Sequence, residues 1–488
     1  MTSGTPHRLV ALGLDGGDLA YIRRNRRSLP VLSAALERGV VMEPHSPEAL
    51  SGAVWPTFYN GCSPGVHGVY QHLVWDPQRM GLRKIRPDWC YYHPFWREMD
   101  RRSRRVAVID VPYSFPSTPG KGLELTDWAT HGQTWPLACS DPRLKSILRE
   151  LGPSPIGRET PVEKSATQLA ALGRRLESSA ALKGELLVRI LQELRPGVLI
   201  SVFGETHRGG HTLFGSRDEE PGGGASALLD VYRAVDAALG RVLETVDEGV
   251  DDVLLFSVHG MQRDHAQCHL VRPLLSRVNR VFLEGASGSP GAAGGMGLVR
   301  RLRSVVPARL QHAVGAASPD WLRQWVVERE MIGGLDWSRT PGFALRTDIR
   351  TELRLNLKGR EARGFLEQGS DEERRYTDLL SRTFLELEDV DTGRRLVDEV
   401  VPIHERFPGP GCERLPDLVV TWRPEPPARR VESPGVGRLT VKPTNARGGD
   451  HVDRGFAVLN GPASRRAESL PPLQSTEDFA DFLLALAG

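Results

Sequence analysis

Short runs of consecutive apolar residues alternate along this chain with longer amphipathic stretches, and this alternation limits the fold more than any other feature. Leu9–Leu14, Val198–Phe203 and Val253–Ser257 have the length and continuous apolar character of strands buried on both faces. Ala225–Val246, between the last two, has the pattern of an amphipathic helix. The alternation predicts an α/β fold, with helices on both faces of a parallel or mixed sheet. Similar elements are expected at Leu29–Arg38, Val106–Val111, Pro416–Trp422, Phe456–Leu459 and after the capping residue Ser475.

Composition excludes several functional classes. The chain has 63 Lys and Arg against 61 Asp and Glu, and a net charge of +2 gives no basis for a nucleic-acid or membrane-surface partner. No stretch approaches the roughly 20 apolar residues of a membrane span, and the N-terminus lacks a signal-peptide pattern. The five cysteines are scattered without a CxxC pair, which favours free thiols in a reducing compartment. A cytoplasmic protein is therefore expected.

Two segments look like insertions into a single domain that spans residues 1–488. The first is a helical insertion or cap at 132–195, where Pro161–Leu194 is charged and helical in pattern. The second is at 270–335 and contains a Gly-rich loop at 285–297. Neither insertion carries a motif that indicates chemistry, so the sequence leaves their role open.

Polar side chains follow the predicted strands where each strand ends. Asp15 follows the first strand, His207 and His211 follow Val198–Phe203, His259 follows Val253–Ser257, and His451 precedes a late strand. Each residue alone could be structural, since a histidine near a strand end is often a satisfied core residue and an aspartate can cap a turn. Ligands gather beyond the carboxyl ends of strands in open α/β sheets, however. One carboxylate and four imidazoles together predict a site for a divalent metal such as zinc.

The segment Ser51–Gly68 contains a Pro-x-x-His-Gly element at Pro64–Gly68. With the ordered landmarks above, it resembles the nucleophile segment of the type I phosphodiesterase/nucleotide pyrophosphatase branch of the alkaline phosphatase superfamily. In that branch a Ser or Thr precedes the element by a fixed interval, and counting back from His67 leads to Ser51. Thr57 is the competing nucleophile by composition. The resemblance implies an alkaline-phosphatase-like fold with a mixed, mostly parallel sheet, helices on both faces and helical insertions.

The resemblance also implies a mechanism with two metal ions and a covalent phospho-enzyme on Ser51. His72 falls where relatives place an Asn that donates to the phosphoryl oxygen. His131 is expected either to line the substrate pocket or to have a structural role. Zinc is the favoured ion, one or two per chain, with manganese or iron as alternatives. The implied ligands are Asp15, Ser51 and His259 on the nucleophile side, and His207, His211 and His451 on the other.

The chain departs from the family pattern at two ligand positions. The Asp-x-x-x-His element of the family is His207-x-x-x-His211 here, and its Ser-Asp-His-Gly element carries Val258 in place of Asp. Imidazole still binds zinc, but valine cannot coordinate a metal. The changes remove two negative charges, so either a more anionic substrate compensates or the nucleophile-side metal binds weakly. Asp264 is a substitute ligand or a solvated loop residue, and His265 and His269 are expected to be structural.

The favoured function is hydrolysis of a small-molecule phosphate ester, with phosphodiesters or nucleotide pyrophosphates ahead of phosphomonoesters. A phosphotransferase of the mutase type and a non-catalytic or single-metal binding protein are the alternatives. A sulfatase is disfavoured, because Cys62-Ser63-Pro64-Gly65-Val66 lacks the Arg that the sulfatase nucleophile motif requires.

Overall fold

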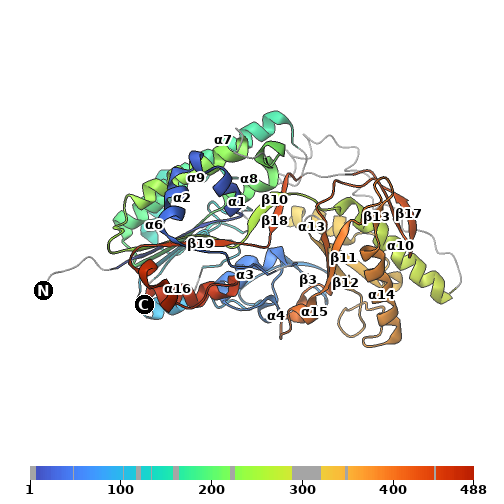
Figure 1. Ribbon diagram of the computed structural model, residues 1–488. Helices are drawn as coiled ribbons and strands as arrows, with labels where there is room; N and C mark the ends of the chain where they lie inside the picture. The colour runs from blue at the N-terminus through green and yellow to red at the C-terminus, as the bar shows by residue number, and fades with distance from the viewer. Residues whose placement is uncertain are drawn as a thin grey trace.

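A mixed, mostly parallel sheet forms the centre of the computed structural model (Figure 1). The structure describes residues 7–47, 49–102, 104–116, 122–132, 135–157, 164–219, 226–287, 320–346, 350–443 and 447–488. Within these ranges the sheet has eight strands, in the spatial order β2 (Val40–Met42), β19 (Phe456–Asn460), β9 (Asp252–Ser257), β1 (Leu9–Leu14), β8 (Val198–Phe203), β5 (Val106–Ile109), β6 (Leu123–Thr126) and β7 (Ala138–Cys139). The strands from β9 to β6 are parallel, whereas β19 and β7 are antiparallel to their neighbours. The predicted fold class is therefore confirmed.

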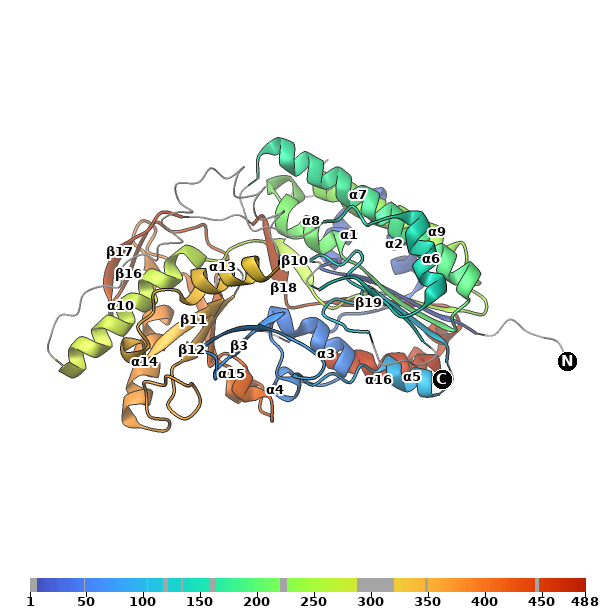
Figure 2. The ribbon, with the colours of Figure 1, turned by 180° about the vertical axis from the view of Figure 1, so that it is seen from behind.

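Strand β1 shows why helices cover both faces of this sheet. Leu9 and Ala11 belong to one apolar cluster and Val10, Leu12 and Leu14 to the other, because successive side chains of a strand point to opposite faces. Figure 2 shows the two helical layers from behind. One layer contains α1 (Leu19–Arg24), α2 (Pro30–Arg38), α6 (Pro142–Leu151), α7 (Ala166–Arg189), α8 (Glu205–Leu213) and α9 (Ala227–Leu243), and the other contains α3 (Val54–Asn60), α4 (Pro64–His67), α5 (Trp96–Arg101) and α16 (Phe479–Ala487).

The segment between β10 (Gly260–Arg263) and β18 (Gly449–Val452) builds a second lobe with its own apolar cluster (Figure 1). Its main sheet has the order β11-β12-β15-β14, and β10 pairs with β18 as a ribbon that leads back to the central sheet. The strands are β11 (Gly342–Arg346), β12 (Thr351–Leu355), β13 (Glu388–Asp389), β14 (Val397–Pro402), β15 (Leu418–Trp422), β16 (Arg430–Ser433) and β17 (Gly437–Thr440). The helices are α10 (Cys268–Ser287), α13 (Asp320–Ile332), α14 (Asp371–Leu385) and α15 (Ile403–Arg406), and the hairpin β3 (Leu73–Asp76)–β4 (Gly81–Lys84) lies close by.

Several expected elements differ in detail. The strand expected at Pro416–Trp422 is β15, which pairs in the second sheet and not in the central one. The segment before the last central strand, expected as a loop, is itself strand β18. The expected Gly-rich loop at 285–297 lies outside the described residues from 288 onwards. No helix of the described ranges is long and apolar enough to cross a membrane.

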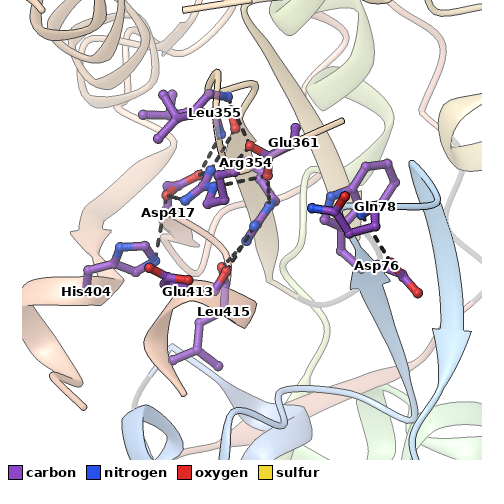
Figure 3. A network of polar contacts seen from close by, with 12 residues as sticks. Asp76, Gln78, Arg354, Leu355, Glu361, His404, Glu413, Leu415 and Asp417 are labelled. Atoms are coloured by element: carbon purple, nitrogen blue, oxygen red, sulfur yellow. Dashed lines mark hydrogen bonds and ion pairs between the residues drawn. The ribbon is translucent and has the colours of Figure 1, made fainter. Parts of the chain in front are cut away.

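A network of buried charges fastens β12 to the loop before β15 (Figure 3). The Nε of Arg354 lies 2.7 Å from Oε1 of Glu361, and its terminal nitrogens donate to the carbonyl oxygens of Leu415 and Glu413 at 2.6 and 2.9 Å. Asp417 in the same loop accepts from the backbone N–H of β12 at 2.6 Å. The side chains of Arg354 and Glu361 are fully buried, so the network depends on every partner being present.

Replacing Arg354 with alanine is expected to lower the free energy of unfolding by about 3 kcal/mol, because the substitution removes one of the two arginines that pair with buried Glu361 and the donor to two carbonyl oxygens. Urea unfolding followed by circular dichroism measures this change. Arg38→Ala is the matched control, since its pair with Glu248 is more than half exposed, at 59% and 53%, and should contribute little. Equal losses of unfolding free energy in the two variants would contradict a stabilising role for the buried network.

Candidate active site and metal centre

The carboxyl ends of the parallel strands gather the polar side chains that the sequence singled out. Asp15 follows β1, His207 and His211 lie on α8 directly after β8, and His259 follows β9. Strands β9, β1 and β8 are neighbours in the sheet, so these three ends are adjacent. His451 lies on β18, where the chain returns from the second lobe, and β18 pairs with β10 just after His259. The ribbon of β10 and β18 therefore brings a distant part of the sequence to the site.

Asp15 lies at the centre of this arrangement and is fully buried. Its Oδ1 accepts a hydrogen bond from the indole N–H of Trp55 at 2.9 Å and lies 3.2 Å from Nε2 of His259. The Nδ1 of His207 is 3.0 Å from the same oxygen. The other oxygen, Oδ2, is 2.6 Å from Nδ1 of His131. One carboxylate thus faces three imidazoles inside the protein.

A second group consists of the three imidazoles of His207, His211 and His451. Their potential ligand atoms lie within 4.8 Å of one another, and the Nε2 atoms of His211 and His451 are 3.0 Å apart. Two nitrogens on one tetrahedral zinc ion lie about 3.3 Å apart, given Zn–N bonds of about 2.0–2.1 Å. The spacing of the imidazoles therefore suits a shared cation.

The hydrogen bonds of the remaining ring nitrogens orient these imidazoles. The Nδ1 of His211 lies 2.8 Å from the carbonyl oxygen of Gly449, and the Nδ1 of His259 lies 3.1 Å from the carbonyl of the next residue. Each Nδ1 must carry the proton of the neutral ring, which leaves a lone pair on Nε2. Those lone pairs face the Nε2 of His451 and Oδ1 of Asp15. Acceptors that face each other need a proton or a cation between them, and this donor set fits a divalent cation.

Burial and charge set the protonation states of the cluster. Burial alone would raise the pKa of Asp15, but nearby His207 and His131 lower it well below its usual value. Burial lowers the pKa of His207 to about 4, and it holds the pKa values of His211 and His451 well below their usual range. At neutral pH Asp15 is therefore ionised and the imidazoles of His207, His211 and His451 are neutral, which are the forms that bind metal.

Ser51 lies in a short 3-10 helix, Ser51–Ala53, that leads into α3. Trp55, one turn further along, donates to Asp15 and so ties this segment to the end of β1. Gly52 approaches Gln71 closely, because a Cβ at Gly52 would lie 2.1 Å from the Gln71 amide nitrogen. A side chain at position 52 would push the serine segment away from its neighbours.

Thr57, the competing hydroxyl, has a different environment. It is fully buried, and its Oγ1 lies 3.1 Å from Nε2 of His67. The Nδ1 of His67 accepts from the backbone N–H of Val69, so the neutral ring donates from Nε2 to Thr57. Burial lowers the pKa of His67 to about 3, which keeps the ring neutral. This hydroxyl therefore joins α3 to α4.

The two expected substrate-binding histidines lie at different places. His131 is within the cluster, and its ring stacks on that of His207 with centroids 3.9 Å apart and an interplanar angle of 7°. His72 is one ring further out: its centroid is 5.9 Å from that of Tyr113, which is 6.2 Å from that of His131. The sequence assigned His72 a position in the family pattern and gave His131 none, yet His131 is the one that contacts Asp15.

The structure shows where the residues that depart from the family pattern lie. Val258 is fully buried in the apolar cluster on the α3 side of the sheet. The Oδ1 of Asp264 accepts from the backbone N–H of Ala266 at 2.8 Å, and Asp264 joins neither ligand group formed by the described residues. His269 lies 2.7 Å from the carbonyl oxygen of Ala428 in the second lobe.

A cavity of about 480 Å³ lies close to the backbone of His211. Its lining includes Phe214, Arg263, Arg447 and Gly448, and the N–H of Gly448 donates to the carbonyl of His211 at 2.8 Å. A second cavity, of about 720 Å³, lies beside α6 and β7. Neither cavity is lined by a side chain of the cluster.

Sequence reasoning missed three residues that hold the strand ends together. Trp55 donates to Asp15, and the hydroxyl of Thr206 donates to the backbone carbonyl of Asp15 at 2.6 Å. The hydroxyl of Ser257 accepts from the N–H of Gly17 at 3.1 Å and donates to the carbonyl of the residue after Val258 at 2.7 Å. Thr206 and Ser257 adjoin predicted ligand segments, which is the only local signal that could have found them.

A mostly parallel sheet of this order, with a carboxylate and imidazoles at its carboxyl edge, is the architecture of the alkaline-phosphatase-like fold. The model of the type I phosphodiesterase / nucleotide pyrophosphatase family matches residues 9–286, which is more than half of the chain. The chain belongs to this family, and its enzyme class is therefore that of the phosphoric ester hydrolases.

Solved structures show the same fold at low sequence identity. Phosphonoacetate hydrolase from Sinorhizobium meliloti 1021 in complex with phosphonoformate is 14% identical, with a TM-score of 0.54 over 99% of this chain and 96% of that chain. Murine ectonucleotide pyrophosphatase / phosphodiesterase 5, as an inactive threonine-to-alanine variant in complex with AMP, is 11% identical, with a TM-score of 0.50 over 99% and 95%. No curated protein sequence matches the chain.

Proposed function

We propose that this protein is a metal-dependent hydrolase of phosphodiesters or nucleotide pyrophosphates that acts through a phospho-enzyme on Ser51. The observation that carries the proposal is the cluster at the carboxyl edge of the central sheet, where Asp15 faces three imidazoles and the serine segment is tied to it by Trp55. The inactive threonine-to-alanine variant of the murine relative supports a hydroxyl nucleophile in this family.

Two sets of residues would hold the cations. Asp15, Ser51 and His259 are proposed for the nucleophile side, and the group of His207, His211 and His451 for the other. Zinc suits the imidazole-rich donor set best, ahead of manganese or iron. Such cations supply charge that stabilises a serine alkoxide and polarises phosphoryl oxygens.

The chain's own residues carry the substrate through two displacements. The Oγ of Ser51 attacks phosphorus, the P–O bond to the leaving group breaks, and a phosphoserine ester forms. Water then attacks the same phosphorus, the bond to Oγ breaks, and phosphate or a phosphomonoester leaves. His72 is proposed to donate to a phosphoryl oxygen from outside the cluster, and the cavity lined by Phe214 and Arg447 would accommodate the organic part of the substrate.

Chelation and substrate comparison test this proposal. The protein is expected to hydrolyse bis(p-nitrophenyl) phosphate with a kcat/KM about tenfold or more above that for p-nitrophenyl phosphate. A strong chelator should abolish turnover, because the proposed ligand set alone does not stabilise the alkoxide, and Zn²⁺ should restore it better than Mn²⁺ or Fe²⁺. The absorbance of released p-nitrophenolate measures the rate with each substrate and with each added metal.

The alternative functions predict other outcomes. A preference for the monoester would indicate a phosphomonoesterase. Isomerisation of phosphoglycerate would indicate a mutase, and hydrolysis of p-nitrophenyl sulfate would indicate a sulfatase. Phosphonoacetate belongs in the same panel, because that compound is the substrate in the name of a structural relative. Absence of turnover with every substrate, in protein carrying its full metal complement, would refute the proposal in favour of a binding protein.

A further inference from the structure

The nucleophile-side group lacks one ligand that the family pattern provides. Val258 stands where the pattern has an aspartate, and its side chain is fully buried among apolar residues. Asp264, the nearest acidic candidate in sequence, is hydrogen bonded to Ala266 instead. A cation beside Asp15 would therefore have to obtain a donor from elsewhere in the fold.

His131 reaches Asp15 from a strand end that sequence patterns did not connect to the metal site. It lies on the loop after β6, and its Nδ1 is 2.6 Å from Oδ2 of Asp15. The potential ligand atoms of Asp15, His131 and His207 lie within 4.8 Å of one another. The side chain of His131 is only 10% exposed, so a cation among these atoms would be shielded from solvent.

The loop that carries His131 is fixed by buried polar contacts. Both oxygens of Asp110 are used, because they accept the backbone N–H groups of Trp128 and Ala129 at 2.9 Å each. Arg208 on α8 donates to the backbone carbonyl of His131 at 3.0 Å. A loop held in this way positions its side chain before any ligand arrives, as metal sites require.

The long helix of the first insertion supports this loop from behind. Lys183 on α7 is fully buried, and its Nζ lies 3.0 Å from Oδ2 of Asp110 and donates to the carbonyl of Val202 on β8. Gly204, just after that strand, leaves room for the loop, because a Cβ there would be 2.6 Å from the backbone nitrogen of His131. The helix α7 thus takes part in building the site, beyond covering the sheet.

We propose that His131 is a metal ligand that replaces the aspartate missing at position 258, and that it holds the nucleophile-side cation together with Asp15. The inference rests on the proposed function, in which that cation activates Ser51. A neutral imidazole in place of a carboxylate keeps the number of donors and gives up one negative charge, so the cation there is one of those that bind nitrogen well. The competing role for His131 is a hydrogen bond that merely orients Asp15.

Two substitutions at position 131 separate these roles, because their side-chain atoms reach as far as the Nδ1 of histidine. Asparagine keeps an N–H that can donate to Asp15 but is a poor zinc ligand. Aspartate is a good zinc ligand, but without a cation it would repel Asp15. Apoprotein of each variant is titrated with Zn²⁺ against a chromophoric chelator, without substrate. His93→Asn is the matched control, at an exposed histidine outside the site.

If His131 is a direct metal ligand, His131→Asn should weaken one Zn²⁺ equivalent by more than about 100-fold, which exceeds the loss expected for a residue that only orients a ligand. His131→Asp and His93→Asn should both retain the wild-type zinc stoichiometry. Thermal unfolding of the apoproteins in chelator should give His131→Asp a lower melting temperature than His131→Asn, because the two carboxylates repel each other without a cation. Wild-type zinc affinity in folded His131→Asn, or loss of zinc in folded His131→Asp, would overturn the proposal. Zinc binding is measured without turnover, so an inactive protein with zinc binding that depends on His131 would refute the hydrolase function and leave this inference standing.

Discussion

Ser51→Ala is expected to lower kcat for the preferred ester by roughly 10³-fold or more, because the substitution removes the atom that forms the covalent intermediate. Zinc content should fall far less than activity, since most proposed ligands are unchanged. Steady-state hydrolysis and metal analysis of the same preparation measure both quantities. The wild-type chain, quenched in acid during turnover of a diester, should carry a phosphoryl group that retains the second ester substituent. Mass spectrometry detects this adduct, which should be absent from the variant.

Thr57→Val is the control for Ser51→Ala. The Thr57 hydroxyl is bound to His67 inside the packing of α3, so its loss should reduce stability while leaving kcat within about threefold of wild type in the folded protein. If Thr57→Val abolished turnover and Ser51→Ala did not, the nucleophile would be Thr57. The assignment of Ser51 from its spacing to His67 would then be wrong.

His211→Ala is expected to weaken zinc binding by more than about 100-fold and to abolish hydrolysis. Loss of a residue that only orients a metal ligand costs about 10–100-fold in affinity, and loss of a direct ligand should cost more. His211 is buried, its Nδ1 is held by the carbonyl of Gly449, and its Nε2 lies 3.0 Å from that of His451. The lost imidazole therefore has no replacement among its neighbours.

His269→Ala provides the matched control for His211→Ala. His269 is partly buried and lies in the second lobe. Like His211, it is hydrogen bonded to a backbone carbonyl, that of Ala428. Zinc affinity and activity should stay near wild type in this variant, and thermal unfolding should register any structural loss. Unchanged zinc affinity in folded His211→Ala would remove the three-imidazole group from the proposed metal site.

The central sheet was accessible to sequence reasoning because its strands are buried on both faces. A run such as Leu9–Leu14 needs apolar residues at every position, and that requirement is visible without coordinates. The same holds for Asp15 and His259, since parallel strands place their carboxyl ends at one edge. The strand at Leu418–Trp422 was predicted, but its pairing was not, because an apolar run does not specify which sheet it joins.

The contacts that complete the site were not accessible in this way. No motif marks Trp55 as part of the site, because its role depends on where its indole N–H points. His131 looked equally suited to a structural role, and its contact with Asp15 joins residues 116 positions apart. No local pattern encodes such a distance, since it results from the packing of the whole sheet.

The sequence by itself determined the α/β class, the strand ends that carry chemistry, and the loss of two family carboxylates at His207 and Val258, because residue type and periodicity are local properties. Only the tertiary structure decided that Asp15 faces three imidazoles and that the β10–β18 ribbon brings His451 to His211. The physical reason is that a metal site depends on the direction of lone pairs over a few ångströms, and those directions are set by long-range packing and hydrogen bonds.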